Sequence, residues 1–588
     1  MLLFSFFFTK KNIMQNSTIQ LPTKDKRIFL PENLVIDSWE KLSSYFEDLK
    51  NREINSVQEL EEWLKDRSEL EAVLEEDMAW RYIKMNIDTT NTDLADSFSF
   101  FITEIEPKIA PYTNAFNLKL VNNQFLNDLD KETYHIYLRG IKKQIEIFRE
   151  ENIPLNTKLQ EESQKYGAVS AAMTINYDGK ELTLQQASNF LKNTDRKIRE
   201  EVFYLINNRR LQDENELNTL YTELIKLRNQ VAKNAGFANY RDYMFAALGR
   251  FDYEAKDCFN FHEAIEKEVV PVTNGFDVEK KQLLSVDALK PWDTAVDPTG
   301  KPALKPFEGG EELINKTITA FNRIKPYFGE CLAIMKELKH LDLDSKKGKA
   351  PGGFNYPLHE IGVPFIYMNS VGSQRDLVTM VHEGGHAIHS FLTRNLALTG
   401  FKDTPSEVAE LASMSMELLS MDYWDEFYTD ETELKRAKKE QLEKALETLP
   451  WVASIDKFQH WVYENPMHTV EQRYAKWNDI MKAFGSNQVD WTGNEKALAT
   501  LWQKQLHLFE VPFYYIEYGM AQLGAIAVWR NYKQNPNKAI EQYMAALKLG
   551  YTKSIKEIYQ AAGIEFNFSQ AYVKELVDFI KGELKKIQ

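Results

Sequence analysis

Most of this chain has hydrophobic residues spaced as they are in amphipathic helices. Between residues 56 and 85, apolar side chains recur every three or four positions among charged ones. Those on the inner stripe are Leu60, Leu64, Leu70, Val73 and Leu74. Similar stretches continue to about residue 285 and return after Met421, where we expect Pro450 to end a helix. The pattern predicts a mostly α-helical fold.

Two stretches interrupt the helical pattern. From 174 to 183, alternating apolar residues flank Asp178-Gly179, which is typical of a tight hairpin. Farther on, 351–356 has the composition of a Gly-rich loop and 363–369 that of a strand. A proline near the start of this strand, Pro364, indicates an edge position. We therefore expect a small β element before the next helix.

That next helix contains the sequence His382-Glu383-Gly384-Gly385-His386. Ser373 with Asp376 three residues later is a helix-start signal. Positions four apart share a helix face, so His382 and His386 can offer two imidazoles to one metal with Glu383 beside them. The composition gives roughly 0.03 accidental matches to this motif. Because glycines inside a helix cost about 1 kcal/mol each, we expect Gly384-Gly385 to let a strand or substrate approach the metal closely.

A third ligand is predicted downstream. Residues 404–407, Thr-Pro-Ser-Glu, form a capping box with proline at the first helical position, so a second helix is expected there. Glu410 lies on it among small apolar residues, where a carboxylate is costly unless it is paired or binds metal. Catalytic zinc takes three protein ligands and keeps one position for water. We therefore predict one Zn²⁺ bound by His382, His386 and Glu410.

Two other residues near these helix faces are not expected to bind the metal directly. Glu417 is expected to hydrogen-bond a ligating histidine, and His389 to be a packed histidine rather than a ligand. The pairs His262-Glu263 and His359-Glu360 have no second histidine at the required spacing. We interpret both pairs as ordinary surface or core residues.

The segment His-Glu-Gly-Gly-His-Ala-Ile-His at 382–389 is followed, 28 positions after its first histidine, by Ala-Glu-Leu-Ala-Ser. This arrangement resembles the thimet oligopeptidase and oligoendopeptidase F family of zinc metallopeptidases. With matching stretches at 347–353 and 507–518, the resemblance covers most of 200–588. It implies that two histidines and the later glutamate bind zinc, that Glu383 is the general base, and that an elongated helical body encloses a deep substrate channel.

The aromatic stretch at 507–518 carries a further expectation. One histidine and two tyrosines three apart have polar tips that can donate hydrogen bonds to an oxyanion. The resemblance places His507, Tyr515 and Tyr518 in that role, although the spacing between the histidine and the tyrosines is one residue shorter here. Tyr514 is expected to be a core residue.

The strand predicted beside the metal suggests how substrate binds. An exposed edge would pair with an extended peptide through main-chain hydrogen bonds, which accept almost any side chain. We therefore expect Gly352, Gly353, Phe365, Tyr367 and Asn369 to bind substrate. The alternative is a structural strand that only supports the helix.

Composition limits the partners and the location. The net charge of −15, with no basic stretch, disfavours nucleic acid. Cys258 and Cys331 are the only cysteines, too few for a disulfide framework, which fits a reducing interior. The apolar run at 1–8 is too short to span a bilayer and lacks a leader's features, so no membrane association is expected. We predict a cytoplasmic protein, a monomer or small homo-oligomer.

The chain is expected to comprise an N-terminal tail (1–36) for which disorder is one interpretation, a helical domain (37–200) and a catalytic domain (201–588). The predicted function is zinc-dependent cleavage of internal bonds in short, unstructured oligopeptides. Two alternatives stay open, namely a zinc carboxypeptidase or dipeptidyl carboxypeptidase, and a non-catalytic peptide-binding protein with the same fold. The intact Glu383 disfavours the last, because a binding protein needs no general base.

Overall fold

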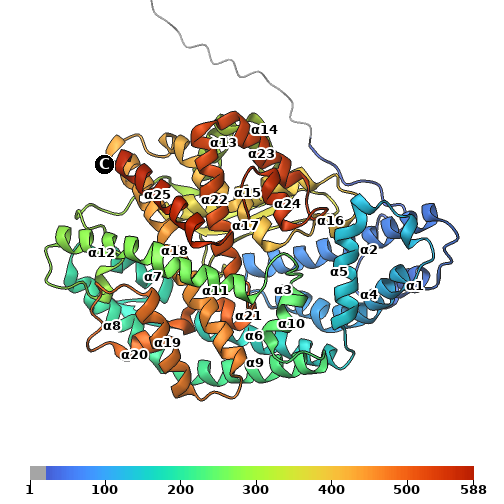
Figure 1. Ribbon diagram of the computed structural model, residues 1–588, viewed down its shortest axis with the longest axis horizontal. Helices are drawn as coiled ribbons and strands as arrows, with labels where there is room; N and C mark the ends of the chain where they lie inside the picture. The colour runs from blue at the N-terminus through green and yellow to red at the C-terminus, as the bar shows by residue number, and fades with distance from the viewer. Residues whose placement is uncertain (1–20, 588) are drawn as a thin grey trace, which may run out of the picture.

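The computed structural model describes residues 21–587, which form an elongated, mostly helical body (Figure 1). The predicted fold class is confirmed, with strands in the described residues limited to two small sheets. The helices before the hairpin are α1 (Glu40–Asn51), α2 (Val57–Ile87), α3 (Thr92–Phe100), α4 (Glu106–Val121), α5 (Lys131–Ile147) and α6 (Asn152–Ala171). Those between the hairpin and the three-stranded sheet are α7 (Leu184–Ser188), α8 (Arg196–Gln212), α9 (Glu214–Asn234), α10 (Tyr240–Ala247), α11 (Ala255–Ala264), α12 (Val270–Leu284), α13 (Gly309–Ile324) and α14 (Pro326–Glu337).

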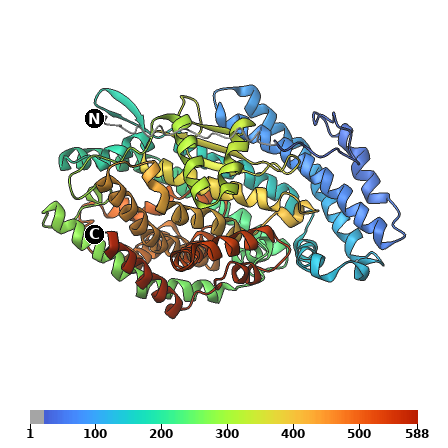
Figure 2. The same ribbon diagram turned by 90° about the horizontal axis from the view of Figure 1, so that it is seen from above.

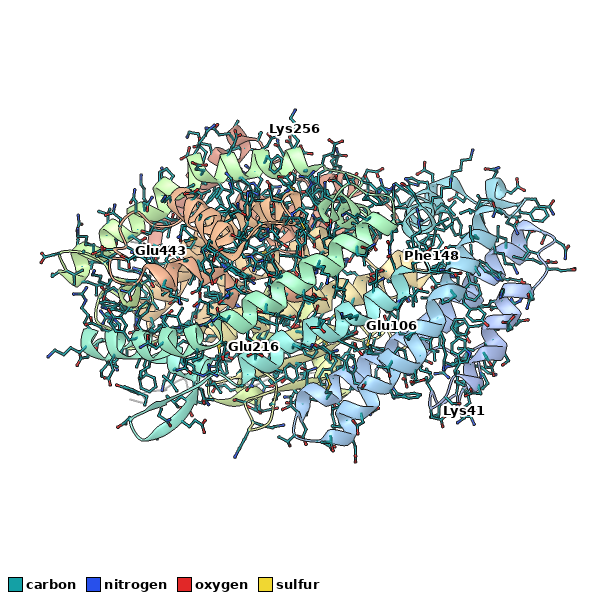
Figure 3. All side chains as sticks on the ribbon, turned by 90° about the horizontal axis from the view of Figure 1, so that it is seen from below. Lys41, Glu106, Phe148, Glu216, Lys256 and Glu443 are labelled. Atoms are coloured by element: carbon teal, nitrogen blue, oxygen red, sulfur yellow. The ribbon has the colours of Figure 1, made fainter. Side chains whose placement is uncertain are left out.

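The C-terminal half is built almost wholly from helices (Figure 2), which contribute most of a large apolar core. They are α15 (Gln374–Thr393), α16 (Thr399–Lys402), α17 (Ser406–Ser420), α18 (Glu431–Glu464), α19 (Val470–Phe484), α20 (Glu495–Ala499), α21 (Leu506–Glu510), α22 (Ile516–Gln534), α23 (Pro536–Lys548), α24 (Ile555–Ala561) and α25 (Gln570–Ile587). Charged side chains such as Glu216 and Lys256 project outward from this body (Figure 3).

Helix α2 follows the predicted stripe closely. Ser56 caps its start by accepting a hydrogen bond from the backbone N–H of Glu59. The predicted inner residues, Leu60, Leu64, Leu70, Val73 and Leu74, are all buried. They pack with residues of α1, α4 and α5 in a second, smaller core. Local periodicity was therefore sufficient to define this helix and its buried face.

The predicted hairpin is confirmed. Strands β1 (Thr174–Tyr177) and β2 (Lys180–Thr183) pair antiparallel, with Tyr177 opposite Lys180. Asp178 and Gly179 form the turn, and both have positive φ angles, as a two-residue turn of this kind requires.

The three-stranded sheet differs from the prediction in its strand order. Strands β3 (Leu341–Asp344), β4 (Gly353–Tyr356) and β5 (Phe365–Ser370) lie in the order β3-β5-β4. The stretch 351–356 thus contains a strand and is not only a loop. The predicted edge strand is the central one, so that prediction is wrong. Strand β5 pairs parallel with β3 and antiparallel with β4, which leaves β4 with a free edge.

Both faces of the sheet are covered. Phe365 and Tyr367 point toward α2, where the rings of Trp80 and Phe365 lie 5.6 Å apart. Ile366 and Met368 alternate with them and join the main core beside α15. Because side chains alternate along a strand, an uninterrupted apolar run is what a strand buried on both faces requires.

Pro450 does not end a helix, contrary to the prediction. It lies inside α18, which continues to Glu464. An interior proline costs about 3 kcal/mol through its lost N–H and its clash with the preceding turn. Here Leu446, Leu449 and Val452 are fully buried around it, and the hydroxyl of Ser454 donates to the Pro450 carbonyl. Tertiary packing therefore outweighs the local preference.

The apolar run at 1–8 lies outside the described residues. Residues 21–36 contain no helix or strand, and they lie against the body. The guanidinium of Arg27 donates to Glu360 at 2.6 Å, and the backbone N–H of Leu30 donates to Glu69 at 2.7 Å. The domain boundaries at 36 and 200 stay predictions. No helix in the described part of the chain is both long and apolar enough to cross a membrane.

Candidate active site

Helix α15 begins as the sequence predicts. The hydroxyl of Ser373 accepts from the backbone N–H of Asp376, whose carboxylate accepts from the backbone N–H of Ser373. This capping box sets the rotation of the helix from its first turn. His382 and His386 consequently project from one face, with their rings 5.0 Å apart.

Gly384 and Gly385 permit close approach of other helices, and not of a strand or substrate as predicted. A Cβ atom on Gly385 would lie 2.6 Å from the Cα of Ser413 on α17. A Cβ on Gly384 would lie 2.8 Å from the ring of Phe321 on α13. Such contacts are about 1 Å shorter than ordinary van der Waals distances. Gly385 therefore sets the spacing between α15 and α17, the two helices that carry the candidate ligands, and Gly384 sets the spacing to α13.

Helix α17 begins one residue later than predicted, and the capping box at Thr404 is absent. Its N-cap is Pro405, with no side-chain hydrogen bond. Glu407 turns inward instead, where its carboxylate accepts from the hydroxyl of Tyr253 at 2.5 Å. Buried Arg250 lies beside this pair and donates to Glu517 at 2.8 Å. The glutamate thus forms a buried contact that local sequence could not reveal.

The three predicted ligands lie together. One donor atom from each of His382, His386 and Glu410 lies within 4.8 Å of the others. Glu410 Oε2 is 3.4 Å from His382 Nε2 and 3.8 Å from His386 Nε2. Burial favours protonation of Glu410, but His382, His386 and the hydroxyl of Tyr514 lower its pKa to about 2. The carboxylate therefore keeps its charge, as a metal ligand must.

Glu417 lies where the sequence placed it, against the far side of a candidate ligand. Its Oε1 accepts from His382 Nδ1 at 2.7 Å, and its Oε2 accepts from Gln441 at 2.8 Å. Burial disfavours a charged His382 ring, but Glu410 and Glu417 raise its pKa well above the usual range, so a cation bound at Nε2 would take the place of the ring proton there. His389 is buried one turn beyond His386, and burial lowers its pKa to about 3. It is not among the three residues whose donor atoms converge.

Glu383 lies beside these ligands and faces strand β4. The side chain of Asn355 donates to the backbone carbonyl of Glu383 at 3.2 Å, which joins the strand to the helix. Burial raises the pKa of the Glu383 carboxyl to about 7. A carboxyl group with a pKa in this range can both accept and release a proton near neutral pH.

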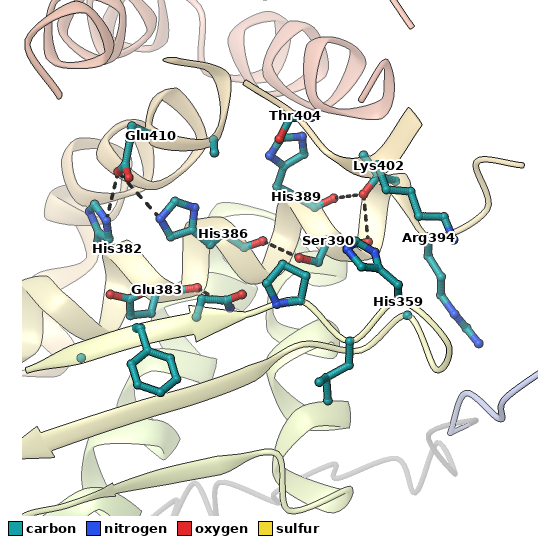
Figure 4. A pocket seen from close by; sticks show the side chains of 18 of the residues that line it. His359, His382, Glu383, His386, His389, Ser390, Arg394, Lys402, Thr404 and Glu410 are labelled. Carbon is teal, nitrogen blue, oxygen red and sulfur yellow. Dashed lines mark hydrogen bonds and ion pairs between the residues drawn. The ribbon is translucent and has the colours of Figure 1, made fainter. Parts of the chain in front are cut away.

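A cavity of about 360 Å³ connects these groups. The wall at one end of the cavity is formed by His382, Glu383, His386 and Glu410 (Figure 4). The wall at the other end is formed by His359, Arg394 and Lys402. His359 thus lines the cavity, although the sequence suggested only an ordinary residue. Burial lowers the pKa of His359 to about 4.

Two of the three clustered tyrosines line the cavity. Tyr514, expected to be a core residue, donates its hydroxyl to Glu410 Oε1 at 2.9 Å. Tyr518 lines the same cavity, and burial holds the pKa of its hydroxyl well above the usual range. The hydroxyl therefore remains a hydrogen-bond donor. Tyr515, which was predicted at the oxyanion, is not part of the cavity wall.

His507 lies behind these tyrosines, with its ring centre 4.8 Å from that of Tyr515 and 5.7 Å from that of Tyr518. The indole N–H of Trp451 donates to Oε1 of Gln505 at 2.9 Å, which fixes the orientation of this amide. The amide nitrogen then donates to His507 Nδ1 at 2.7 Å, so the ring proton lies on Nε2. Burial lowers the pKa of His507 to about 4, which keeps the imidazole neutral.

Comparison with known proteins shows the family to which this chain belongs. Residues 189–578 match Peptidase family M3, and residues 29–148 match the Peptidase M3 N-terminal domain. The chain belongs to Peptidase family M3. It is 25% identical over 577 residues to the oligoendopeptidase F homolog of Borreliella burgdorferi, a match that covers 92% of this chain and 94% of the relative. It is 24% identical over 464 residues to oligopeptidase PepF of Bacillus subtilis, covering 74% and 66%.

The solved structures agree. PZ peptidase A, determined with an inhibitor, superposes with a TM-score of 0.88 at 27% identity, covering 93% of this chain and 97% of that one. The family resemblance and the helical fold predicted from the sequence are therefore confirmed.

The substrate-binding residues predicted on β5 do not fit the structure of this M3 family member. Phe365 and Tyr367 are buried against α2, and the side chain of Asn369 donates to the Ala350 carbonyl at 3.0 Å. Their backbone groups are paired on both sides. The prediction that β5 offers an open edge is wrong, because β4 pairs with β5 along that edge. Among the predicted residues, Gly353 lies on β4 and lines the cavity, while Gly352 precedes that strand.

The edge strand of the three-stranded sheet that borders the cavity is β4. In an antiparallel pair, residues alternate between hydrogen-bonded and non-hydrogen-bonded positions. Gly352 accepts from the backbone N–H of Asn369, which makes Phe354 and Tyr356 the residues bonded to β5. The backbone groups of Gly353 and Asn355 therefore point away from the sheet. Both residues also line the cavity.

Proposed function

We propose that this M3 family chain is a zinc-dependent endopeptidase that hydrolyses internal bonds of short, unstructured oligopeptides. The observation that carries the proposal is the convergence of His382, His386 and Glu410 within 4.8 Å beside the buried carboxyl of Glu383. Two imidazoles and one carboxylate are a donor set of catalytic zinc sites, which leave a fourth position open.

The chain's own residues fit a zinc ion. His382 and His386 would bind through Nε2 and Glu410 through its carboxylate, while Glu417 holds the His382 ring from behind. Zinc bound there would polarise the scissile carbonyl and lower the pKa of its bound water. A neutral imidazole is needed for ligation, and burial lowers the pKa of His386 to about 4, which satisfies that need at neutral pH.

Glu383 would move the proton. Its carboxylate accepts a proton from the attacking water and then releases it to the leaving amine nitrogen. Burial places its pKa near 7, so neither transfer is strongly unfavourable. The residue follows His382 directly and therefore points to a different side of the helix from the ligands.

Tyr518 and His507 would stabilise the tetrahedral oxyanion. Tyr518 lines the cavity and His507 packs against it from behind; each carries a proton that it can donate, on the phenol oxygen of Tyr518 and on Nε2 of His507. Donors of this kind act most strongly where water is excluded. Tyr514 instead orients Glu410, because its hydroxyl is already bonded to that carboxylate.

The substrate would extend along β4. The outward backbone groups of Gly353 and Asn355 can pair with a peptide strand, and main-chain pairing accepts many sequences. An extended segment can enter the cavity, whereas a loop held in a folded protein cannot. Broad sequence preference and a limit on folded substrates are therefore expected together.

One observation favours a second candidate, a carboxypeptidase or dipeptidyl carboxypeptidase. Arg394 and Lys402 line the end of the cavity away from Glu410, where a substrate's terminal carboxylate could bind (Figure 4). A peptide series with free and amidated C-termini separates the two functions. An endopeptidase cleaves both forms at internal bonds, whereas a carboxypeptidase loses most activity on the amide.

The test of the proposed function combines metal analysis with a length series. One peptide, prepared from about four to forty residues, is compared with a folded protein that carries the same segment in a surface loop. Wild-type chain should cleave the peptides only when zinc is bound, and Glu383→Gln should keep zinc while losing most turnover. Cleavage by Glu383→Gln at the wild-type rate would exclude its role as base, and equal cleavage of the folded protein would exclude the restriction to unstructured substrates. A chain that binds peptides without cleaving any would be the non-catalytic alternative.

A further inference from the structure

A second cluster of potential metal ligands lies between α11 and α18, which run side by side (Figure 1). Cys258 and His262 are four residues apart on α11, and Asp456 and His460 are four residues apart on α18. Residues four apart share a helix face, so each helix presents two ligand groups to the other. Lys256, by contrast, points outward from α11 (Figure 3).

The four side chains are in close contact. Asp456 Oδ2 is 2.8 Å from His262 Nε2 and 3.2 Å from His460 Nε2. Donor atoms of Cys258, Asp456 and His460 all lie within 4.8 Å of one another. Thiolate, imidazole and carboxylate are all ligands that bind zinc in proteins.

The cluster is fully buried, and several of its polar atoms have no hydrogen-bond partner among the described residues. Exposure is 0% for Cys258 and Asp456, 1% for His262 and 2% for His460. Within residues 21–587, Asp456 Oδ1, His262 Nδ1 and both ring nitrogens of His460 have no hydrogen-bond partner. His460 Nε2 is near Asp456 but outside hydrogen-bonding geometry. Each buried polar atom left in this state costs about 1–3 kcal/mol.

We propose that Cys258, Asp456 and His460 form a second site for a divalent metal of the zinc class, with His262 orienting Asp456 through its hydrogen bond. Such an ion would bond one ring nitrogen of His460 and a carboxylate oxygen of Asp456 directly. The charges also balance, since one thiolate and one carboxylate neutralise a doubly charged ion while both imidazoles stay neutral. A neutral assembly avoids the large desolvation cost of a buried net charge.

The position suggests what the metal does. The ring of His460 lies 5.5 Å from that of Phe513, which has a positive φ of 67° and immediately precedes Tyr514. The amide of Gln459 also accepts from the Phe513 backbone N–H at 2.7 Å. Metal binding would therefore fix α11 against α18 and support the segment that carries Tyr514 and Tyr518.

The experiment uses the full chain carrying His386→Ala, which removes a ligand of the proposed catalytic site. This protein is stripped of metal and loaded with Co²⁺. We expect about one tightly bound Co²⁺ per chain with a sulfur-to-cobalt charge-transfer band in the near ultraviolet, because a thiolate ligand produces such a band. The band should disappear in Cys258→Ser and persist in the matched control Cys331→Ser, which changes the other buried cysteine.

Absence of the band from the parent protein, or its survival in Cys258→Ser, would overturn the proposal. A second measurement needs no variant and so does not depend on whether the variants fold. The zinc X-ray absorption spectrum of the unaltered chain should contain scattering from sulfur, since His382, His386 and Glu410 supply none. A spectrum with nitrogen and oxygen ligands alone would also reject the second site, and it would leave the proposed peptidase chemistry intact.

Discussion

Replacing Gly385 with alanine should separate the two helices that carry the candidate zinc ligands. The new Cβ would lie 2.6 Å from the Cα of Ser413 and 2.7 Å from the carbonyl oxygen of Ala412. Both neighbours are backbone atoms, so no side-chain rotation can relieve the overlap. Since ordinary contacts are about 3.5–4.0 Å, α17 must move away by on the order of 1 Å.

Two opposing effects set the size of the change in stability. Alanine gains about 1 kcal/mol over glycine inside a helix. Overpacking a core costs about 1–3 kcal/mol, and a backbone neighbour places this site at the upper end. We therefore expect Gly385→Ala to lower the free energy of unfolding by about 2 kcal/mol. Metal sites tolerate displacements of only about 0.2 Å, so zinc affinity should fall by at least about tenfold.

The assay pairs denaturant unfolding with a zinc-chelator competition. The matched control is Gly140→Ala on α5, because a Cβ at Gly140 meets no atom within 4 Å. That variant should be more stable by up to about 1 kcal/mol with unchanged zinc affinity. If Gly385→Ala behaved like Gly140→Ala in both measurements, the argument that this glycine sets the distance between ligand-bearing helices would be refuted.

Three further predictions concern the surroundings of the site and the stability of the fold. Glu417→Gln should reduce zinc affinity about 10–100-fold while leaving the fold intact, because it weakens the acceptor for His382 Nδ1; unchanged chelator competition would contradict this. Arg250→Ala should lower the free energy of unfolding by about 3–5 kcal/mol, since Glu407, Glu517 and the Phe513 carbonyl would all lose their buried cationic partner; Arg250→Lys should recover part of the loss, and a denaturation midpoint near wild type in the alanine variant would contradict the reasoning. Burial lowers the pKa of His468 to about 4, below the unfolded value of about 6.5, so this residue contributes stability at neutral pH that is lost as the pH falls from about 6.5 through 4. A pH series of unfolding should show a shallower loss in His468→Asn than in wild type, and parallel curves would exclude this contribution.

Features set by local spacing could be predicted from the sequence. His382 and His386 were expected to share a face because they lie four residues apart on one helix, and the start of α15 was expected because Ser373 and Asp376 are close in the chain. The same is true of α2 and of the hairpin turn. Glu410 was predicted because a carboxylate among small apolar residues needs a partner, and it lies within 4.8 Å of both histidines.

Features that depend on distant partners could not be predicted. Whether β5 is central or at an edge depends on β3 and β4, and no local pattern reports which strand lies beside it. Pro450 stays helical because of residues packed around it. The sequence offers no means of telling Tyr514, Tyr515 and Tyr518 apart. Which of them line the cavity depends on the conformation of the chain after Phe513.

The order of the site residues along the chain has a consequence for protein synthesis. His382 and Glu410 are translated well before α22, against which α17 packs, and before the tyrosines of the cavity wall. At about 5–20 residues per second, the tyrosines follow the first histidine on the order of ten seconds later. Throughout that interval Glu410 lacks the hydroxyl of Tyr514, and α17 has no α22 to cover it. An unfinished chain on the ribosome therefore has no complete cavity in which to cleave itself or its neighbours.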